Sequence, residues 1–248
     1  MRLLIPSLLL AMACDGTSPR PPASPPPSPQ QIHPRSPVLM ASETEPSAAS
    51  VSSTTKAASG TRGEVVLVPL GRPFPAPVLD AIERGLRDEL QVEVIRHERV
   101  PLPKAAYYPR RKRYRAEKLL DHLLTLIPDA PPTTRVLGLT TTDISTTKGT
   151  HEDWGIFGLG LVPGQAAVVS IHRLGRGANN GARLRRRASV TAVHEVGHTF
   201  GLDHCPEKRC PMQDAQGSID NTDSSTGHLG PQCRAALEAR FPRRETLR

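Results

Sequence analysis

The sequence predicts an α/β sandwich with a mixed β-sheet, on the basis of two observations. From residue 63 onward, short apolar runs of strand length alternate with amphipathic segments of helix length, the order expected of an α/β domain. Near residue 163, two apolar runs follow each other across a Pro-Gly turn, which predicts an adjacent strand pair. About 185 residues are enough for one small domain with its own core.

The first predicted elements are a strand, a helix and a second strand. Residues 63–70 form a β-branched run closed by proline and glycine, which predicts a strand. Residues 77–90 place Val, Leu and Ile at the spacing of a helix that is buried on one face. Residues 92–95 form the second predicted strand.

The middle of the chain is predicted to contain one helix and three more strands. After a loop flanked by prolines, the helix covers residues 115–127 and is stopped by Pro128. The strands cover residues 135–140, 156–162 and 166–171. Residues 147–154 are polar and are predicted to form a loop ahead of a strand, in which Trp154 could line a substrate cleft, anchor the loop or pack in the core.

The last part of the chain is predicted to hold two helices separated by a loop. A long helix covers residues 184–200, and a final helix lies near residues 232–241. The segment between them is rich in Gly, Pro and polar residues, which favour loops.

Residues 1–14 are predicted to be a signal peptide. Arg2 supplies a positive start, and residues 3–13 form an apolar stretch that is too short to span a bilayer. The stretch ends in Ala11-Met12-Ala13-Cys14, which resembles a bacterial lipobox, although lipoboxes usually carry Leu where Ala11 stands. Three interpretations of this segment are open: a lipoprotein signal with the anchor at Cys14, an ordinary cleaved signal peptide, or a hydrophobic N-terminus without such a role. We expect an exported, periplasmic or cell-surface protein.

Residues 15–62 are predicted to be a disordered linker, and residues 63–248 the folded domain. Of the 26 prolines, 11 precede residue 62, in a stretch crowded with Ser, Thr and Ala. Such a segment lacks the apolar content that offsets the entropy of ordering the chain. A stiff proline-rich segment would suit a tether that holds the domain off a membrane.

The chain is basic, with a net charge of +8 and Arg clusters at residues 110–115 and 183–187. Such clusters attract phosphate, and near a tethered domain they could attract anionic lipid. However, only 3% of residues are aromatic and no nucleic-acid motif is recognisable, so no nucleic-acid partner is expected. The clusters are predicted to be solvated helix faces.

The segment from His194 to His204 carries a pattern typical of a metal site. His194 and His198 are four residues apart, so a helix places both imidazoles on one face. Gly201 accepts positive φ and lets the chain leave the helix sharply, which allows His204 to supply a third nitrogen. Three protein ligands leave one position of a tetrahedral zinc ion open, as in catalytic sites.

Glu195 follows the first histidine and is predicted to be the catalytic base. Its carboxylate can reach a zinc-bound water without binding the metal. Zinc lowers the pKa of such a water, Glu195 takes the proton, and the hydroxide attacks a peptide carbonyl. The pattern therefore predicts a zinc-dependent peptidase that acts on peptides or proteins.

The extended histidine pattern is that of the metzincins, and its continuation resembles the archaemetzincins. Cys205 follows the third histidine, and Cys210-Pro211-Met212 comes next, which places Met212 in the turn that metzincins have beneath the metal. The resemblance covers roughly residues 63–241. It includes blocks at residues 68–71, 106–116, 137–144, 156–158 and 169–174. It implies a metzincin-like three-layer sandwich with a zinc-binding helix, and an edge strand at residues 156–162, or its partner, along which substrate lies.

In archaemetzincins four cysteines hold a second, structural zinc, and here the sequence departs from the family. Cys205, Cys210 and Cys233 are in register, but Gly230 stands where the fourth cysteine belongs. His228 or water could complete a second zinc site, two cysteines could form a disulfide in an oxidising compartment or bind no metal, or the site could be incomplete and labile. The missing cysteine motivates an alternative function as a catalytically weak zinc-binding surface or interaction protein. A monomer is expected.

Overall fold

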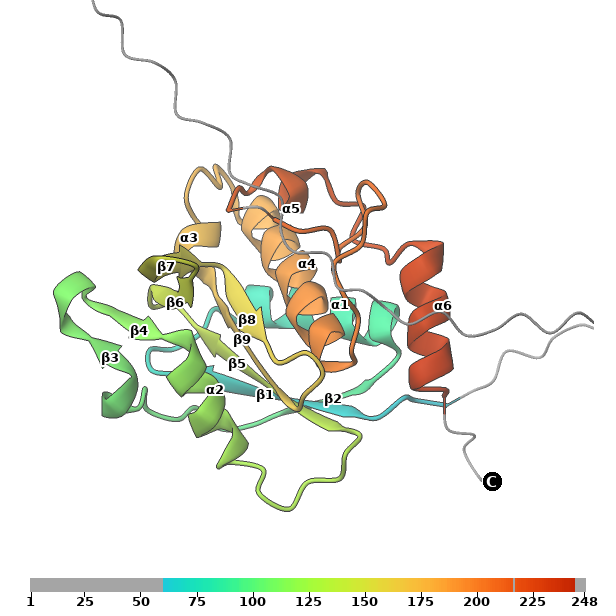
Figure 1. Ribbon diagram of the computed structural model, residues 1–248, viewed down its shortest axis with the longest axis horizontal. Coiled ribbons are helices and arrows are strands. Elements are labelled where there is room, and N and C mark those ends of the chain that lie inside the picture. Colours follow the sequence, from blue (N-terminus) through green and yellow to red (C-terminus); the bar gives the residue numbers. More distant parts are fainter. Residues whose placement is uncertain (1–59, 216, 244–248) are drawn as a thin grey trace, which may run out of the picture. The chain divides into compact units, whose positions relative to one another are not determined.

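The computed structural model describes residues 60–215 and 217–243, and its main feature is a five-stranded sheet (Figure 1). The strand order is β2-β1-β5-β9-β8, with β8 antiparallel to β9 and all other neighbours parallel. The predicted mixed sheet is therefore confirmed. The strands are β1 (Glu64–Leu70), β2 (Glu93–Arg96), β5 (Thr134–Thr140), β8 (Gly158–Gly160) and β9 (Ala166–Ser170).

Helices cover both faces of this sheet, which gives the three layers that the family resemblance implied. Helices α1 (Ala76–Leu90) and α4 (Gly181–Thr199) pack side by side on one face, and α2 (Ala116–Leu124) packs on the other. Successive side chains of a strand point to opposite faces of the sheet, so each central strand contributes to the hydrophobic core on both faces. In β5, Leu137 and Leu139 join the core under α1 and α4, whereas Val136 joins the core under α2.

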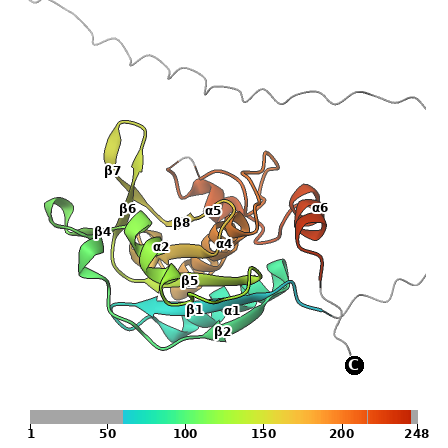
Figure 2. The same ribbon diagram turned by 60° about the horizontal axis from the view of Figure 1, so that its bottom comes forward.

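A second, four-stranded sheet lies beside the main one and was missed by the sequence analysis (Figure 2). Its strands, in the order β3-β4-β6-β7, are β3 (Tyr107–Tyr108), β4 (Arg113–Arg115), β6 (Ile144–Lys148) and β7 (His151–Ile156). Short 3-10 turns, η1 (Lys104–Ala106) and η2 (Pro109–Arg111), flank β3. The loop prediction for residues 147–154 was wrong because these strands are polar and half-exposed, so no apolar run marks them.

The C-terminal third contains two short helices besides the two predicted long ones. Helix α4 begins at Gly181, earlier than predicted, because the side chain of Asn180 caps it by accepting a hydrogen bond from the Arg183 amide. The last helix, α6 (Pro231–Arg240), is close to its predicted bounds. Helices α3 (Ile171–Leu174) and α5 (Asp220–Ser224) were missed, since each is about one turn long.

The folded domain includes Arg62, one residue before its predicted start. Arg62 is buried and donates hydrogen bonds to Gln91, Glu238 and the carbonyl of Phe241, so it joins the start of β1 to the end of α6. The predicted signal peptide and most of the predicted linker lie outside the described residues. Among the helices of the described ranges, none has the length and apolar character needed to cross a membrane.

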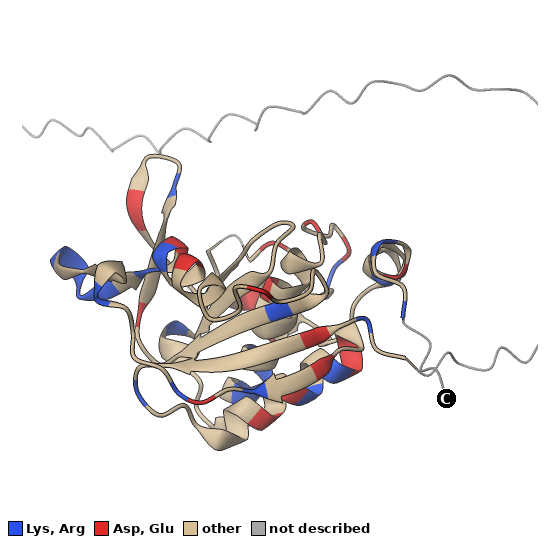
Figure 3. Cartoon of the chain, turned by 90° about the horizontal axis from the view of Figure 1, so that it is seen from below, with Lys and Arg blue, Asp and Glu red and all other residues tan. Residues whose placement is uncertain are grey.

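The two Arg clusters are only partly exposed to solvent. Figure 3 shows Lys and Arg interspersed with Asp and Glu along the domain. Arg110 and Lys112, around η2, are exposed as predicted. Arg113 instead pairs with Asp143 and Asp153, each at 3.3 Å. Arg187 is buried inside the domain. For these two arginines the prediction of a solvated face was wrong, because local composition does not reveal carboxylates that are distant in sequence.

Candidate active site

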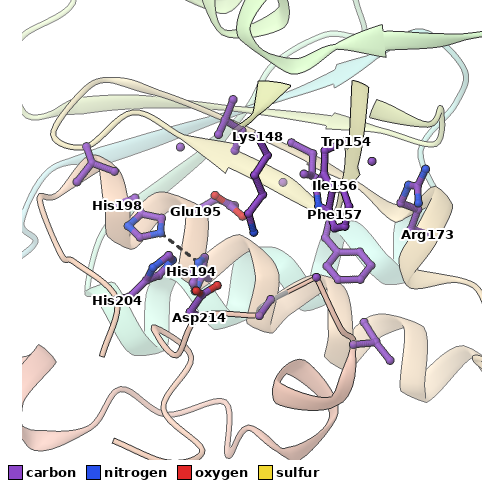
Figure 4. A pocket seen from close by; sticks show the side chains of 18 of the residues that line it. Lys148, Trp154, Ile156, Phe157, Arg173, His194, Glu195, His198, His204 and Asp214 are labelled. Carbon is purple, nitrogen blue, oxygen red and sulfur yellow. Dashed lines mark hydrogen bonds between the residues drawn. The ribbon is translucent and has the colours of Figure 1, made fainter. Parts of the chain in front are cut away.

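Helix α4 brings His194 and His198 together at its C-terminal end, as their four-residue spacing predicted. Their Nε2 atoms lie 3.1 Å apart (Figure 4). Nδ1 of His194 lies 2.7 Å from the carbonyl oxygen of Pro211, and Nδ1 of His198 lies 2.7 Å from that of Leu202. Because a carbonyl oxygen can only accept, each Nδ1 carries the hydrogen and donates it. Both Nε2 lone pairs are thereby turned towards a common point, as in metal-binding histidines.

Gly201 makes the turn that returns His204 to this point. Its φ is +76°, in the left-handed region that glycine adopts without strain, and its amide donates to the carbonyl of His198 at 2.8 Å. The His204 ring centroid lies 5.3 Å from that of His194 and 5.0 Å from that of His198. One ligand nitrogen from each histidine falls within 4.8 Å of the other two, so the structure assembles the three predicted ligands.

Burial keeps the two helical histidines neutral, which is the protonation state that binds a metal. It lowers the pKa of His194 to about 3, with the neighbouring His198 as the next largest cause. Burial also lowers the pKa of His198. Neutral imidazoles with oriented lone pairs, as at His194 and His198, fit the ligand set of a catalytic zinc ion.

Glu195 is buried between α4 and β8, beside the histidines (Figure 4). Burial raises the pKa of its carboxyl to about 8, and a hydrogen bond from the backbone of Gly160 opposes part of this rise. A carboxyl group poised near neutral pH suits a general base. The close approach of β8 requires glycine, since a Cβ on Gly158 would lie 2.5 Å from Cγ of Glu195 and a Cβ on Gly160 would lie 2.3 Å from its carbonyl oxygen.

Met212, the predicted turn methionine, is fully buried and packs against Gly197, which lies between His194 and His198 in α4. Its carbonyl accepts a hydrogen bond of 2.8 Å from the amide of Cys205, which closes the loop that follows His204. Gly197 in α4 makes room for it, because a Cβ there would lie 2.6 Å from the Met212 sulfur. This role of Gly197 was not predicted, although a glycine inside a helical histidine motif could have indicated a close contact.

A cavity of about 710 Å³ opens above the histidines and Glu195. Trp154 lines it, as one of the alternatives predicted for that side chain required. Further lining residues were missed because they come from several separate elements: the acids Asp203 and Asp214, and the bases Lys148, Arg173 and Arg176. Lys148 belongs to β6, a strand that the sequence analysis did not find, and its ammonium lies 5.8 Å from the ring centre of Trp154.

Strand β8 forms one edge of the main sheet and lines this cavity. The predicted edge strand at residues 156–162 is therefore found, although it is shorter than predicted. One side of β8 pairs with β9, and the described residues place no strand on its other side. A peptide in extended conformation could pair with that side by backbone hydrogen bonds.

An ion pair between the buried Arg187 and the partly exposed Asp223 anchors the segment around α5. Nε and Nη2 of Arg187 in α4 each lie 2.7 Å from a carboxylate oxygen of Asp223 in α5. Nη1 of Arg187 donates to the carbonyls of Leu174 and Arg176, at 2.8 and 2.7 Å. One guanidinium thus ties α3, α4 and α5 together. Loss of its partner would leave a buried charge without compensation.

We expect Asp223→Asn to lower the free energy of unfolding by about 2 kcal/mol, the scale of a hydrogen-bonded charge. Arg187 lowers the pKa of Asp223 below its usual 3.8, so the unfolded chain binds more protons near that pH. The pair is therefore fully stabilising above about pH 4, and its contribution is lost as pH falls through the lower folded pKa. Urea unfolding of wild type and variant over a pH series measures this difference, which should shrink in acid.

Asp80→Asn is the matched control for this prediction. Asp80 pairs with Arg96 at 2.7 Å, but both side chains are nearly half exposed. Its loss should change the free energy of unfolding by less than about 1 kcal/mol. Equal effects of the two substitutions would contradict the anchoring role of Asp223.

Cys205, Cys210 and Cys233 form a second cluster next to the histidines. All three are buried and unbridged, and their sulfurs fall within 4.8 Å of one another. The Cys210 and Cys233 sulfurs lie 3.7 Å apart and share a hydrogen bond, which lowers the pKa of Cys210. His228 does not reach the cluster. Its side chain is 74% exposed, and its Nδ1 lies 2.7 Å from Glu89, so the interpretation of His228 as the fourth ligand is wrong for this structure.

Comparison with known proteins identifies the same family as the histidine pattern. The sequence profile of Peptidase family M54 matches residues 72–239. An archaemetzincin of Natronomonas pharaonis is 33% identical over 155 residues, which cover 60% of this chain and 84% of that protein. The crystal structure of an archaemetzincin from Methanopyrus kandleri has a TM-score of 0.63 at 31% identity and covers 73% of this chain and 96% of its own. A second one, from Archaeoglobus fulgidus in complex with malonate, has a TM-score of 0.57 at 25% identity, with 70% and 99% covered.

Proposed function

This chain belongs to peptidase family M54, the archaemetzincins, and is a zinc-dependent peptidase; we propose that His194, His198 and His204 hold its zinc and that Glu195 is its general base. The convergence of three histidine nitrogens within 4.8 Å is the observation that carries the proposal. Family membership does not favour the alternative of a weakly catalytic zinc-binding surface protein.

A zinc ion in this site would polarise the peptide carbonyl and acidify an attacking water. The protein's own contribution is orientation and proton transfer. The hydrogen bonds from His194 and His198 to backbone carbonyls fix both imidazole rings before any ligand binds. Glu195 accepts the proton of the attacking water at a carboxylate oxygen and delivers it to the nitrogen of the departing amine.

Substrate binding is assigned to the cavity wall formed by β8. A peptide that pairs with the open side of this strand would lie across the three histidines with its backbone held at several points. The substrate class is therefore an extended peptide or an extended segment of a protein.

We also propose that the protein is exported and is anchored to a membrane by a lipid on Cys14. The positive start, the apolar residues 3–13 and the lipobox-like end support it. Cys14→Ser should release the protein from the membrane fraction of cells that express the full chain. Equal membrane association of wild type and variant would contradict lipidation of Cys14.

The peptidase proposal predicts that chelation abolishes cleavage. The full chain should cleave members of a peptide library, lose this activity in a chelator, and regain it with zinc but not with magnesium, because imidazole ligands favour zinc. Mass spectrometry of the library identifies the cleaved bonds. Cleavage by the metal-free chain, or an inert chain with zinc bound to the histidines, would contradict the proposal.

A further inference from the structure

A second cavity, of about 720 Å³, lies at the carboxyl ends of the parallel strands and shares no described lining residue with the cavity above the histidines. Gly71 follows β1, Thr141 follows β5, and His172 lies just beyond the end of β9. Tyr107 and Tyr114 of the second sheet add to its wall. The volume is that of a small-molecule site, for which about 300 to 1,000 Å³ is usual.

The path of the chain explains why a crevice forms here. Strands β1 and β5 are parallel neighbours, but the chain leaves them towards opposite faces of the sheet. After β1 it enters α1, and after β5 it enters β6, where Ile144 packs into the core under α2. In open α/β sheets, ligands bind in the crevice at the carboxyl ends of strands that diverge in this way.

The mouth of this crevice is built from closely packed backbone. Gly71 has a φ of +81°, and a Cβ on it would lie 2.7 Å from Cδ1 of Leu102, so only glycine lets the loop after β2 approach the end of β1. Nη1 of Arg99 donates to the carbonyl of Gly71 at 2.8 Å. This bond holds one guanidinium group at the mouth, beside the end of β1.

Three cations from three separate loops line the crevice. Arg72 lies after β1, Arg99 after β2, and Lys112 between η2 and β4. The ion pairs within the described ranges involve none of these three side chains. Uncompensated charge that lines a crevice concentrates ions of the opposite sign.

Asp143 is the one acid among the described lining residues, and its charge is compensated. Its Oδ1 accepts a hydrogen bond of 2.7 Å from Nε of Arg173, and its Oδ2 lies 3.3 Å from Nε of Arg113. Arg173 lines the cavity above the histidines, so its ion pair with Asp143 lies between the two cavities. The crevice thus keeps a net positive charge, which favours an anionic ligand.

Lys112 holds its ammonium at the crevice from a backbone conformation that lysine rarely adopts. Its φ is +52°, in the left-handed region, where it ends η2. Glycine would adopt this conformation without strain. A strained residue that also carries one of the three charges indicates a functional role for its side chain.

Tyr107 and Tyr114 give the crevice an aromatic surface. Their ring centroids lie 5.2 Å apart, and 43% of Tyr107 remains exposed. An exposed aromatic ring gains free energy when a flat ligand packs against it. The crevice therefore combines a site for an anion with a surface for an aromatic body.

We propose that this crevice binds a small molecule in which a phosphate group is attached to an aromatic body, of the size of a mononucleotide. A phosphate monoester carries about two negative charges near neutral pH, which suits three cations better than a single carboxylate does. The guanidinium groups of Arg72 and Arg99 match the geometry of phosphate oxygens, and the ring of Tyr107 packs against the aromatic body. This site is separate from the zinc site and adds a ligand-binding function to the peptidase.

Isothermal titration calorimetry of the full chain with adenosine monophosphate, inorganic phosphate and adenosine tests this proposal. We expect adenosine monophosphate to bind most tightly, because only it engages both the cations and the tyrosine. Arg72→Ala and Lys112→Gly should each weaken its binding by at least about 10-fold, the scale of a hydrogen bond to a charged group. Glycine fits the left-handed position, so Lys112→Gly should keep the wild-type unfolding midpoint.

Two further variants separate the parts of the site. Tyr107→Ala should weaken the binding of adenosine monophosphate but leave that of inorganic phosphate unchanged. Arg176→Ala removes an exposed cation of the cavity above the histidines and should change neither. Equal binding of adenosine and its monophosphate, binding that ignores Arg72→Ala and Lys112→Gly, or binding that ignores Tyr107→Ala would overturn the proposal. So would binding that is lost in Arg176→Ala, binding of a single-stranded oligonucleotide alone, or no binding at all.

Discussion

Glu195→Gln is expected to lower kcat/KM for peptide hydrolysis by about 10²- to 10⁴-fold, the usual contribution of a general base. Glutamine keeps the shape of the side chain between α4 and β8 but has no basic oxygen that can take a proton. The histidine ligands are untouched, so zinc content should stay at the wild-type level. Steady-state kinetics together with metal analysis of the same samples measures both quantities.

The same substitution should stabilise the metal-free chain. Burial raises the pKa of Glu195 from 4.5 to about 8, so between these values the folded chain binds more protons than the unfolded chain. Wild-type stability therefore falls as pH rises through this window, and the variant escapes this loss. Glu93→Gln, at an exposed position of β2, is the control and should change neither activity nor stability. Wild-type activity in Glu195→Gln would disprove its role as base.

Gly160→Ala is expected to lower both stability and activity. The added Cβ would lie 2.3 Å from the carbonyl oxygen of Glu195, an atom of the helix backbone that cannot rotate away. Strand β8 must therefore move off α4, at a cost of about 1 to 3 kcal/mol, as for other overpacked sites. The movement displaces the strand proposed to bind substrate, and a shift of about 1 Å can reduce catalysis about 10²-fold.

Gly175→Ala is the matched control for this substitution. Gly175 has a φ of −72°, and the nearest atom to its added Cβ lies 3.4 Å away, an ordinary contact. Its free energy of unfolding should change by less than about 0.5 kcal/mol. Denaturant unfolding and peptide kinetics on both variants test the contrast. A Gly160→Ala chain that matches Gly175→Ala in both measurements would show that β8 does not depend on this contact.

The main sheet and its covering helices could be predicted because their residues are apolar with a regular period. The alternation in β5 and the stripe in α1 reflect burial on defined faces, and burial leaves a local pattern. The second sheet leaves no such pattern. Strands β6 and β7 are rich in polar residues, and their pairing depends on contacts between strands rather than on composition.

The residues of the candidate site also fall into two groups, those that the sequence predicted and those that it did not. The motif residues lie on one helix and the turn after it, where spacing alone decides which side chains meet. Lys148, Arg173 and Asp214 reach the cavity from three other places in the chain, and no local pattern marks them. Arg187 appeared to belong to a charged surface, yet its partner Asp223 lies 36 residues away in the sequence.

The sequence by itself determined the three-histidine site, because a helix repeats every 3.6 residues and a glycine reverses the chain at a fixed point. Glu195 follows from the same short-range geometry, and Met212 follows from the resemblance to the metzincins. Only the tertiary structure decided the strength of Glu195 as a base, because its raised pKa comes from burial against β8. It alone also decided that the His228 ring lies against Glu89 and does not reach the cysteine cluster, because these segments are distant in the sequence and meet only in the folded chain.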